Sequence, residues 1–380
     1  MPLAELISGC WDHVQGYLFP RLQAEVGPLT DHHRRLITVL EMARIEAFVR
    51  MRDGGPGRPL DDRHALARAF IAKAVLNLAT TAALIERLAV DATLRRLCGW
   101  ERVSQVPSEA TFSRAFAEFA DAGLPVLVHA ALIKRTLGNH LVGHIARDAT
   151  AIEAREKPVK REKPQAQALK RKRGRPRKGE VVPAREPRRL EKQGNQTLAQ
   201  MLADLPTHCT VGTKRNAKGH TTSWIGYKLH IDTADGDIPV TCLLTSASVH
   251  DSQVAIPLAT MTATRVTNCY DLMDTAYDAP EIWAKSRELG HTPIIERHPR
   301  SVVGGKSAIE AEAKARRRIR MHFAEDVRYN QRSSAERVNG ALKDSYGGRC
   351  VRVRGAPKVL CHLMFGILAL AVEQLMRLVT

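Results

Sequence analysis

Apolar residues recur at helical spacing through the first third of the chain. The stretch 63–100 is rich in Ala and Leu and almost free of Gly and Pro, and apolar side chains three and four positions apart share one face of a helix. A similar stripe extends over 112–119, and the Gly- and Pro-rich stretch 52–62 interrupts the pattern. We therefore predict an all-helical domain over 1–140, a candidate for DNA binding or dimerisation.

Alternating and β-branched runs appear after residue 140. "HIARDAT" (144–150) predicts a short strand that ends on Asp148. Two longer strand-like runs, "TSWIGYKLHIDT" and "IPVTCLLTSASV", flank the hairpin signal "ADGD". We interpret Asp232, Asp235 and Asp237 as residues of that turn, because the spacing of a calcium-binding loop is absent.

Helix and strand patterns alternate through the rest of the chain. Helices are expected at 252–263, 279–290, 306–322, 328–343 and 359–372. Strands are expected between them at 268–273 and 292–298. Such alternation is typical of an α/β sheet covered by helices. The last segment has only 14 residues and contains His362, so we interpret it as a buried helix rather than a membrane span.

Charge narrows the range of partners. The 380 residues include 58 Lys and Arg against 40 Asp and Glu, a net charge of +18 at pH 7, which favours a polyanionic partner. The seven cysteines form no CxxC pair, and the N-terminus lacks the pattern of a signal peptide. We therefore expect a soluble cytoplasmic protein with reduced thiols, associated with the nucleoid.

The most basic stretch follows the first predicted strand. Residues 155–178 contain twelve Lys or Arg against two Glu, so this stretch is not expected to fold alone. Within it, "RGRPRK" resembles an AT-hook, which places basic side chains in a narrow minor groove. The candidate DNA contacts are Arg173, Arg175, Arg177 and Lys178. We predict a disordered, DNA-binding insertion over 155–199. A solvated linker is the alternative, and a membrane-surface role is disfavoured because apolar anchors are absent.

Three carboxylates occupy positions suited to a shared site. Asp148 and Asp274 are each expected where a strand ends, the usual place for site residues in such sheets. Glu336, on a later helix, could add a third oxygen ligand, and Asp251 is the main rival carboxylate. Oxygen ligands suit Mg²⁺ or Mn²⁺, and two ions roughly 3.5–4 Å apart can assist both the attacking and the leaving oxygen of a phosphodiester.

Glu336 belongs to a narrow stripe of polar side chains. On a continuous helix, Tyr329, Arg332, Glu336 and Lys343 fall within roughly 60° of one another. The stripe could be a solvated face with an Arg332–Glu336 pair at i,i+4. Alternatively, Glu336 points at a metal while Arg332 and Lys343 hold the DNA backbone. Tyr329 would then orient a phosphate, stack on a base or pack against the sheet.

The spacing of these four residues, Y(2)R(3)E(6)K, resembles the signature of insertion-sequence DDE transposases. "MDTAYDA" (273–279) resembles the second-aspartate segment of that family, and "ARDAT" (146–150) resembles its first-aspartate strand. The resemblance extends over roughly residues 60–375. It implies a ribonuclease-H-like mixed-sheet catalytic domain over 141–154 and 200–380, interrupted by the basic insertion.

The same resemblance implies the chemistry and the partners. The metal-binding catalytic triad would be Asp148, Asp274 and Glu336, with two Mg²⁺ or Mn²⁺ ions, and Arg332 and Lys343 would be the associated DNA-contacting charges. Metal-dependent cleavage at the element ends would free a 3′-hydroxyl for strand transfer into target DNA. The partners would be the terminal inverted repeats and the target DNA, handled by a homodimer or a larger assembly.

Two other functions fit the same residues. A domesticated transposase could act as a non-catalytic DNA-binding protein through its basic insertion and helical domain. A metal-dependent nuclease without strand transfer would need the same carboxylates, because the first cleavage step is chemically the same. Joined DNA products distinguish a transposase from both alternatives.

Overall fold

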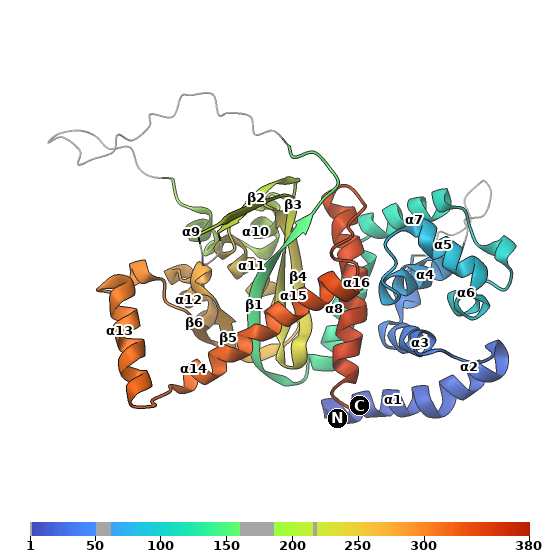
Figure 1. The fold of residues 1–380 in the computed structure, drawn as a ribbon, viewed down its shortest axis with the longest axis horizontal. Coiled ribbons are helices and arrows are strands. Elements are labelled where there is room, and N and C mark those ends of the chain that lie inside the picture. The colour runs from blue at the N-terminus through green and yellow to red at the C-terminus, as the bar shows by residue number, and fades with distance from the viewer. Residues whose placement is uncertain (1, 51–61, 160–185, 216–218) are drawn as a thin grey trace.

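The computed structural model describes residues 2–50, 62–159, 186–215 and 219–380. Within these ranges a helical region and a sheet region lie side by side, and α16 (Ala356–Met376) stands between them (Figure 1). Almost all of the predicted break at 52–62, and the four basic candidates within "RGRPRK", lie outside the described residues. The predicted domain boundaries stay predictions. The predicted disorder of 155–199 is wrong for the end of that segment, because residues 189–193 and 198–199 are helical.

Helices make up most of the described part of the first 137 residues, as the apolar spacing predicts. They are α1 (Leu3–His13), α2 (Phe19–Val26), α3 (Asp31–Ala43), α4 (Arg63–Val75), α5 (Thr81–Val90), α6 (Ala92–Cys98), α7 (Glu109–Asp121) and α8 (Leu124–Leu137). Side chains of Asp62, Thr80 and Asp91 accept backbone N–H groups at the starts of α4, α5 and α6, which stabilises these helix ends.

Six strands of the described chain form one sheet. They are β1 (Leu141–Glu153), β2 (Thr210–Arg215), β3 (Thr221–Ala234), β4 (Ile238–Ser246), β5 (Thr267–Met273) and β6 (Thr292–Ile295). The order along the sheet is β2-β3-β1-β5-β6, and β4 also pairs with β3. The β1–β5 and β5–β6 pairs are parallel and the others are antiparallel. The predicted α/β class is therefore confirmed, with a mixed sheet.

Helices cover the two faces of this sheet. Between β1 and α16 the chain forms the helices α9 (Arg189–Gln193), α10 (Leu198–Asp204), α11 (Ser252–Ala263), α12 (Pro280–Glu288), α13 (Gly305–Arg318), α14 (Ala324–Tyr329) and α15 (Ser333–Ser345). Leu272 of β5 packs with Ala335 of α15, whereas the next residue, Met273, packs with residues of α11 and α12. Because side chains alternate along a strand, α15 covers the face opposite to that covered by α11 and α12.

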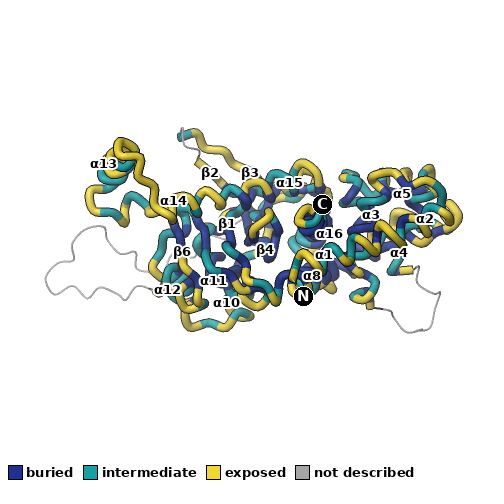
Figure 2. Tube along the Cα trace, turned by 90° about the horizontal axis from the view of Figure 1, so that it is seen from below, coloured by how far each residue is buried: buried dark blue, intermediate teal, exposed yellow. Residues whose placement is uncertain are grey.

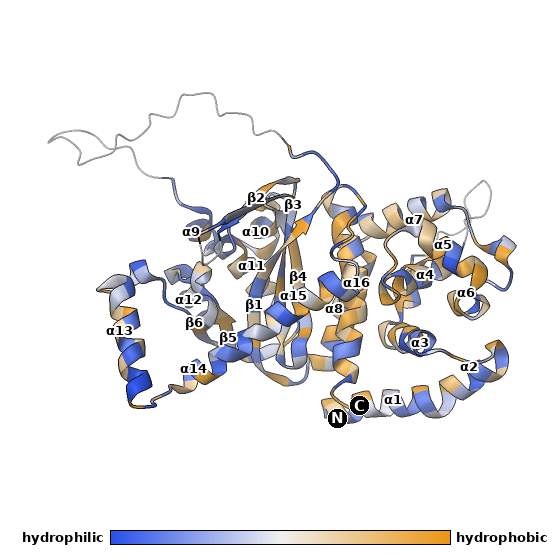
Figure 3. Ribbon diagram, viewed as in Figure 1, coloured by the Kyte–Doolittle hydropathy of each residue, from blue (hydrophilic) through white to orange (hydrophobic). Residues whose placement is uncertain are grey.

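The C-terminal helix α16 is the central element of the largest core. It packs against α3, α4, α7 and α8 on one side and against β4 on the other, and Phe365 lies 5.7 Å from the ring centroid of Phe70 in α4. By length and composition α16 could cross a membrane, but 83% of its most apolar 18-residue stretch is buried inside the protein. Figures 2 and 3 show this buried, apolar helix. The predicted buried helix is therefore confirmed and is longer than the apolar run suggested.

Two local predictions about the sheet are wrong. β1 does not end on Asp148 but continues to Glu153, because its second half pairs with β3. Asp232 is not in the turn: it is fully buried within β3, opposite Arg147 of β1. Only Asp235 and Asp237 belong to the turn before β4. In both cases the deciding factor is strand pairing, which depends on residues far apart in the sequence.

Candidate active site

Sheet geometry brings Asp148 and Asp274 together. In the parallel β1–β5 pair Ala146 lies opposite Leu272, and both aspartates lie two positions further along their chains. Since side chains two positions apart point to the same face, the two carboxylates share the face that α15 covers. Asn339 of α15 donates a hydrogen bond to Oδ2 of Asp148 at 3.1 Å. The site therefore lies between this end of the sheet and α15.

Electrostatics confirm that the two aspartates are neighbours. The pKa of Asp148 is raised to about 6, mainly by burial and in part by the charge of Asp274. The Ala149 N–H, Arg332 and Lys214 act in the opposite direction. Burial also raises the pKa of Asp274. Among the described residues neither carboxylate makes an ion pair. Two half-buried like charges without an ion pair destabilise the folded state, and a cation between them would reduce this destabilisation.

Glu336 is oriented differently from the two aspartates. Its side chain is 58% exposed, and Oε1 accepts a hydrogen bond from Nη2 of Arg332 at 2.7 Å. No group of three or more His, Cys, Asp or Glu side chains is arranged to hold a metal ion in the described parts of the chain. The structure thus brings two of the three predicted ligands together and places the third in an ion pair beside them.

The predicted continuous helix over 328–343 is interrupted. α14 ends at Tyr329, a 3₁₀ turn (η7, Asn330–Arg332) follows, and α15 begins at Ser333. The hydroxyl of Ser333 donates to the carbonyl of Asn330 at 3.0 Å, a local bond of the kind that competes with regular helix. The four residues of the stripe therefore do not share one continuous α-helix, but Arg332 still contacts both Tyr329 and Glu336, as the predicted stripe requires.

The other residues of the stripe, Tyr329, Arg332 and Lys343, have different surroundings. The Tyr329 hydroxyl donates to Oε2 of Glu296 at 3.0 Å, and the Arg332 guanidinium lies 5.7 Å from the Tyr329 ring centroid. Lys343 is partly buried, and this burial, followed by the charge of Arg349, lowers its pKa. Arg332 lowers the pKa of both Asp148 and Asp274, so it lies near the acidic pair.

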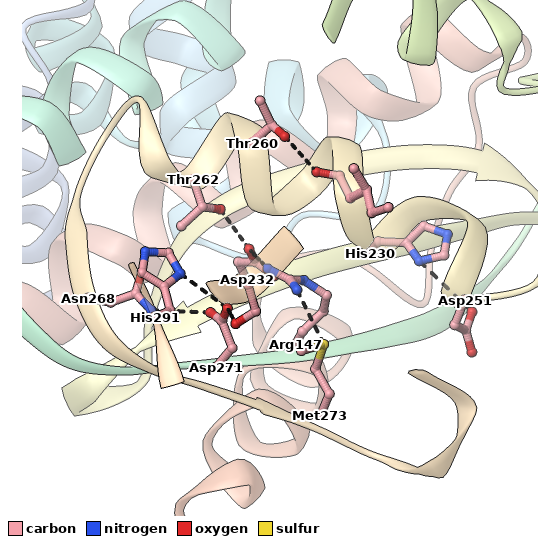
Figure 4. Close-up of polar contacts among 12 residues, drawn as sticks. Arg147, His230, Asp232, Asp251, Thr260, Thr262, Asn268, Asp271, Met273 and His291 are labelled. Carbon is pink, nitrogen blue, oxygen red and sulfur yellow. Dashed lines mark hydrogen bonds and ion pairs between the residues drawn. The ribbon is translucent and has the colours of Figure 1, made fainter. Parts of the chain in front are cut away.

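The rival carboxylate, Asp251, has a counterion. Its Oδ1 lies 2.9 Å from Nζ of Lys228 and 3.9 Å from Nδ1 of His230, and Figure 4 shows the His230 contact. Asp251 acts electrostatically on Asp274, so it is close to the site. Because Lys228 already neutralises it, Asp251 is less suited to hold a cation than Asp148 or Asp274.

A buried ion pair lies on the opposite face of β1, directly beside Asp148. Nε and Nη2 of Arg147 each lie 2.7 Å from one carboxylate oxygen of Asp232, and both side chains are almost completely buried. The hydroxyl of Thr262 in α11 donates to Asp232 at 2.6 Å, and Nη1 of Arg147 lies 3.3 Å from Sδ of Met273 (Figure 4). The pair thereby fixes β1 to β3, α11 and the end of β5.

Three residues near the site escaped the sequence analysis. The role of Asn339 could not be predicted, because an amide side chain on a helix does not indicate a functional site until its hydrogen-bond partner is known. Lys214 comes from β2, far from both aspartates in sequence. Tyr277 is fully buried, and its hydroxyl has no hydrogen-bond partner within the described chain. Burial raises the pKa of Tyr277 well above its ordinary value, and the charges of Asp251, Asp148 and Asp274 add to this effect. Only the fold places these three side chains near the carboxylates.

The donor chemistry fits a divalent cation at the aspartate pair. The carboxylates are hard oxygen ligands, the charge of Asp274 raises the pKa of Asp148, and neither carboxylate makes an ion pair within the described residues. The fit is incomplete at Glu336, which would have to exchange its bond to Arg332 for a position beside the aspartates.

Replacing Asp148 should stabilise the metal-free protein at high pH. Because its folded-state pKa is about 6, above the ordinary value of 3.8, the stability of the wild type falls as pH rises between these values. Asp148→Asn should therefore raise the free energy of unfolding by about 1–3 kcal/mol at pH 8, and this gain should vanish near pH 4. Urea denaturation in EDTA at both pH values measures the effect.

Asp251→Asn is the matched control for that prediction. Asp251 already has Lys228 as its counterion, so its neutralisation should bring no gain in stability at pH 8. Equal unfolding free energies for wild type and Asp148→Asn at pH 8 would contradict the strained carboxylate pair.

Comparison with known proteins assigns the family. A family model described as a transposase DDE domain matches residues 143–372, and one described as a transposase domain (DUF772) matches residues 22–118. No curated protein and no solved structure matches the chain. The first match covers more than half of the chain and contains both aspartates and Glu336. The mixed sheet with its covering helices agrees with a ribonuclease-H-like catalytic domain, and the chain therefore belongs to the insertion-sequence DDE transposases.

Proposed function

We propose that the protein cuts DNA at the ends of its element in a divalent-metal-dependent reaction and joins the freed 3′-hydroxyl to target DNA. The observation that carries this proposal is the pair of half-buried carboxylates, Asp148 and Asp274, neither of which makes an ion pair within the described chain. Such a pair is unfavourable for stability alone, which favours a functional explanation.

Each residue of the site has a role in this proposal. Asp148 and Asp274 hold the metal, Mg²⁺ or Mn²⁺, and Asn339 orients Asp148 through its hydrogen bond. Glu336 completes the ligand set when it leaves Arg332. A pair of divalent ions bound there would supply Lewis-acid stabilisation of the phosphodiester oxygens. No protein nucleophile is required, because water and then a 3′-hydroxyl are the attacking groups.

Positive side chains around the acidic pair would position the DNA. Arg332 lies beside both aspartates, and Lys214 and Lys343 are close enough to repel each other electrostatically. We propose that these three hold the phosphate backbone, with Tyr329 contacting a phosphate or a base at the same edge. The net charge of +18 agrees with such binding, which should weaken steeply with added salt.

The wider assembly is also part of the proposal. Two element ends must be joined to one target, so we propose a homodimer or a larger complex on DNA, acting in the cytoplasm on the nucleoid. We further propose that the basic segment 155–199 and the helical region add DNA or protein contacts to those of the catalytic site.

An excision and joining assay tests the function. A marker flanked by the DNA that borders this gene is incubated with the protein in Mg²⁺ or in EDTA. We expect excised and joined products in Mg²⁺ only. Cleavage without joining would support the plain nuclease, and DNA binding without either product would support the non-catalytic protein.

Asn339 should set the metal affinity of the site. Asn339→Ala removes the side chain that donates to Asp148, and loss of such a partner typically weakens metal binding 10–100-fold. We expect an increase of that order in the Mg²⁺ concentration needed for half-maximal cleavage, with much of the rate restored at saturating Mg²⁺. Calorimetric titration with Mn²⁺ measures the same change independently of cleavage.

The exposed Asn330 of η7 provides the control for that substitution. Asn330→Ala also removes an amide close to the site in sequence, but Asn330 makes no side-chain contact with either aspartate. An unchanged Mn²⁺ affinity in Asn339→Ala, or an equal loss in Asn330→Ala, would contradict the assigned role.

A further inference from the structure

We propose that one face of α13, together with Arg320 two residues beyond its end, binds the backbone of duplex DNA next to the catalytic site. This surface, the α13 basic face, consists of Lys314, Arg317, Arg318 and Arg320. The inference rests on the proposed function, since it names the surface that holds the DNA flanking the reacting phosphodiester.

α13 is a helix without a core of its own. It has 14 residues, none of them buried, and it projects from the sheet region on the side away from the helical region (Figure 1). Figure 2 shows it as mostly exposed. A single helix of this length is marginally stable in water, so a helix that packs so little surface is suited to bind a partner.

The charges of α13 are partly paired and partly free. Glu310 pairs with Lys306 at 3.5 Å, and Glu312 pairs with Arg316 at 3.6 Å. Both acidic residues of the helix are thereby neutralised within the helix itself. Residues 314–320 contain five basic side chains and no acidic one. Lys314, Arg317, Arg318 and Arg320 are all exposed and make no ion pair with the described chain.

The free cations are grouped in space as well as in sequence. Lys314, Arg317 and Arg318 have i, i+3, i+4 spacing, so they share one face of the last turns of the helix. Arg316 points elsewhere: its Nη1 lies 2.8 Å from Asp326 of α14, and its guanidinium lies 4.8 Å from the Phe323 ring centroid. Figure 3 shows the strongly hydrophilic end of α13.

The position of α13 connects this face to the catalytic site. The Arg316–Asp326 pair fixes α13 to α14, and α14 leads directly into Tyr329 and Arg332. The Arg328 guanidinium stacks 4.0 Å from the ring centroid of Tyr270 in β5, which fixes α14 to the sheet. A duplex whose phosphodiester lies at the aspartate pair could therefore continue along α13.

Charge selects DNA rather than a second copy of this chain as the occupant. Four exposed cations suit a phosphate backbone, which carries one charge per roughly 1.7 Å of duplex. Two copies that packed through this face would bring eight such cations together, which is unfavourable.

DNA binding across a salt series tests the proposal. The variant Lys314→Gln/Arg317→Gln/Arg318→Gln/Arg320→Gln is compared with wild type in EDTA, with duplex DNA that carries an element end. Each lost phosphate contact lowers the slope of log K against log salt by about 0.9. We expect a slope shallower by about 2–4 and binding weaker by about 10–100-fold near 0.1 M salt.

Two control variants separate charge from folding. Lys306→Gln/Glu310→Gln changes the same helix without changing its net charge, and Lys314→Arg/Arg317→Lys/Arg318→Lys/Arg320→Lys keeps all four charges. Both should bind DNA within about twofold of wild type, because phosphate contacts depend mainly on the positive charge. In wild type, bound DNA should also slow trypsin cleavage at 314–320.

The possible outcomes are distinct. An unchanged affinity and slope in the fourfold Gln variant would overturn the inference. If light scattering also showed that this variant had lost a dimer, the surface would bind a second copy of the chain instead of DNA. If wild type binds no DNA at all, the proposed function fails together with the inference. If the fourfold variant binds weakly while wild type binds well but joins nothing, the surface is supported and the catalytic proposal fails.

Discussion

Asp274→Asn and Glu336→Gln are each expected to abolish metal-dependent cleavage and joining while DNA binding persists. Both substitutions keep the shape of the side chain and remove the negative charge that a divalent ion requires. Loss of a residue that merely supports a metal ligand costs 10–100-fold, so loss of a ligand itself should lower the cleavage rate by more than about a hundredfold. Single-turnover cleavage of a labelled element end at saturating Mg²⁺ measures this.

Controls for that prediction come from neighbouring acids. Glu325→Gln removes an exposed carboxylate of α14 and should leave the cleavage rate unchanged. Asp251→Asn tests the rival ligand. If Asp251→Asn lost cleavage while Asp274→Asn retained it, the ligand set would be wrong. If Glu336→Gln kept the full rate, the Arg332–Glu336 contact would be only a surface ion pair.

The largest expected effect on stability comes from Arg147. Replacing it with Met leaves Asp232 fully buried without its cation, and breaking a buried ion pair on one side typically costs about 3–5 kcal/mol. We expect Arg147→Met to lower the free energy of unfolding by about this amount, as measured by urea denaturation at pH 7.

Two comparisons show whether the buried pair causes this loss. Arg349→Ala breaks a solvent-exposed pair with Asp344 and should cost less than about 1 kcal/mol. The double variant Arg147→Met/Asp232→Leu removes both charges, so it should recover much of the stability lost by Arg147→Met. A single variant as stable as wild type, or a double variant no better than the single one, would contradict the role of the pair.

Most of the fold could be predicted from local sequence patterns. The apolar spacing of 63–100 and 112–119 indicated helices, and the hairpin signal at Asp235-Gly236 lies between β3 and β4. Asp274 follows β5 as predicted, because that strand is bounded by clear signals on both sides. These elements share a property: their limits depend on residues near them in sequence.

The rest depended on contacts between distant segments. Asp148 lies within β1 rather than at its end, because β3 extends the pairing. Asp232 was assigned to a turn, since nothing near it in sequence reveals Arg147 as its partner. The bond of Asn339 to Asp148 joins residues 191 positions apart. The sequence also left open whether Glu336 pairs with Arg332 or points at a metal, and the structure shows the pair.

The most direct test of the central claim is strand transfer from a pre-cut element end. A duplex that already ends in a 3′-hydroxyl is incubated with wild-type protein, target DNA and Mg²⁺, beside the same duplex ending in a 3′-deoxy nucleotide. The proposed mechanism predicts joined products from the 3′-hydroxyl end alone, and none from either end with Asp274→Asn. The absence of joined products from the 3′-hydroxyl end, although wild type binds it and cuts uncut ends, would contradict the assignment of strand transfer to this site.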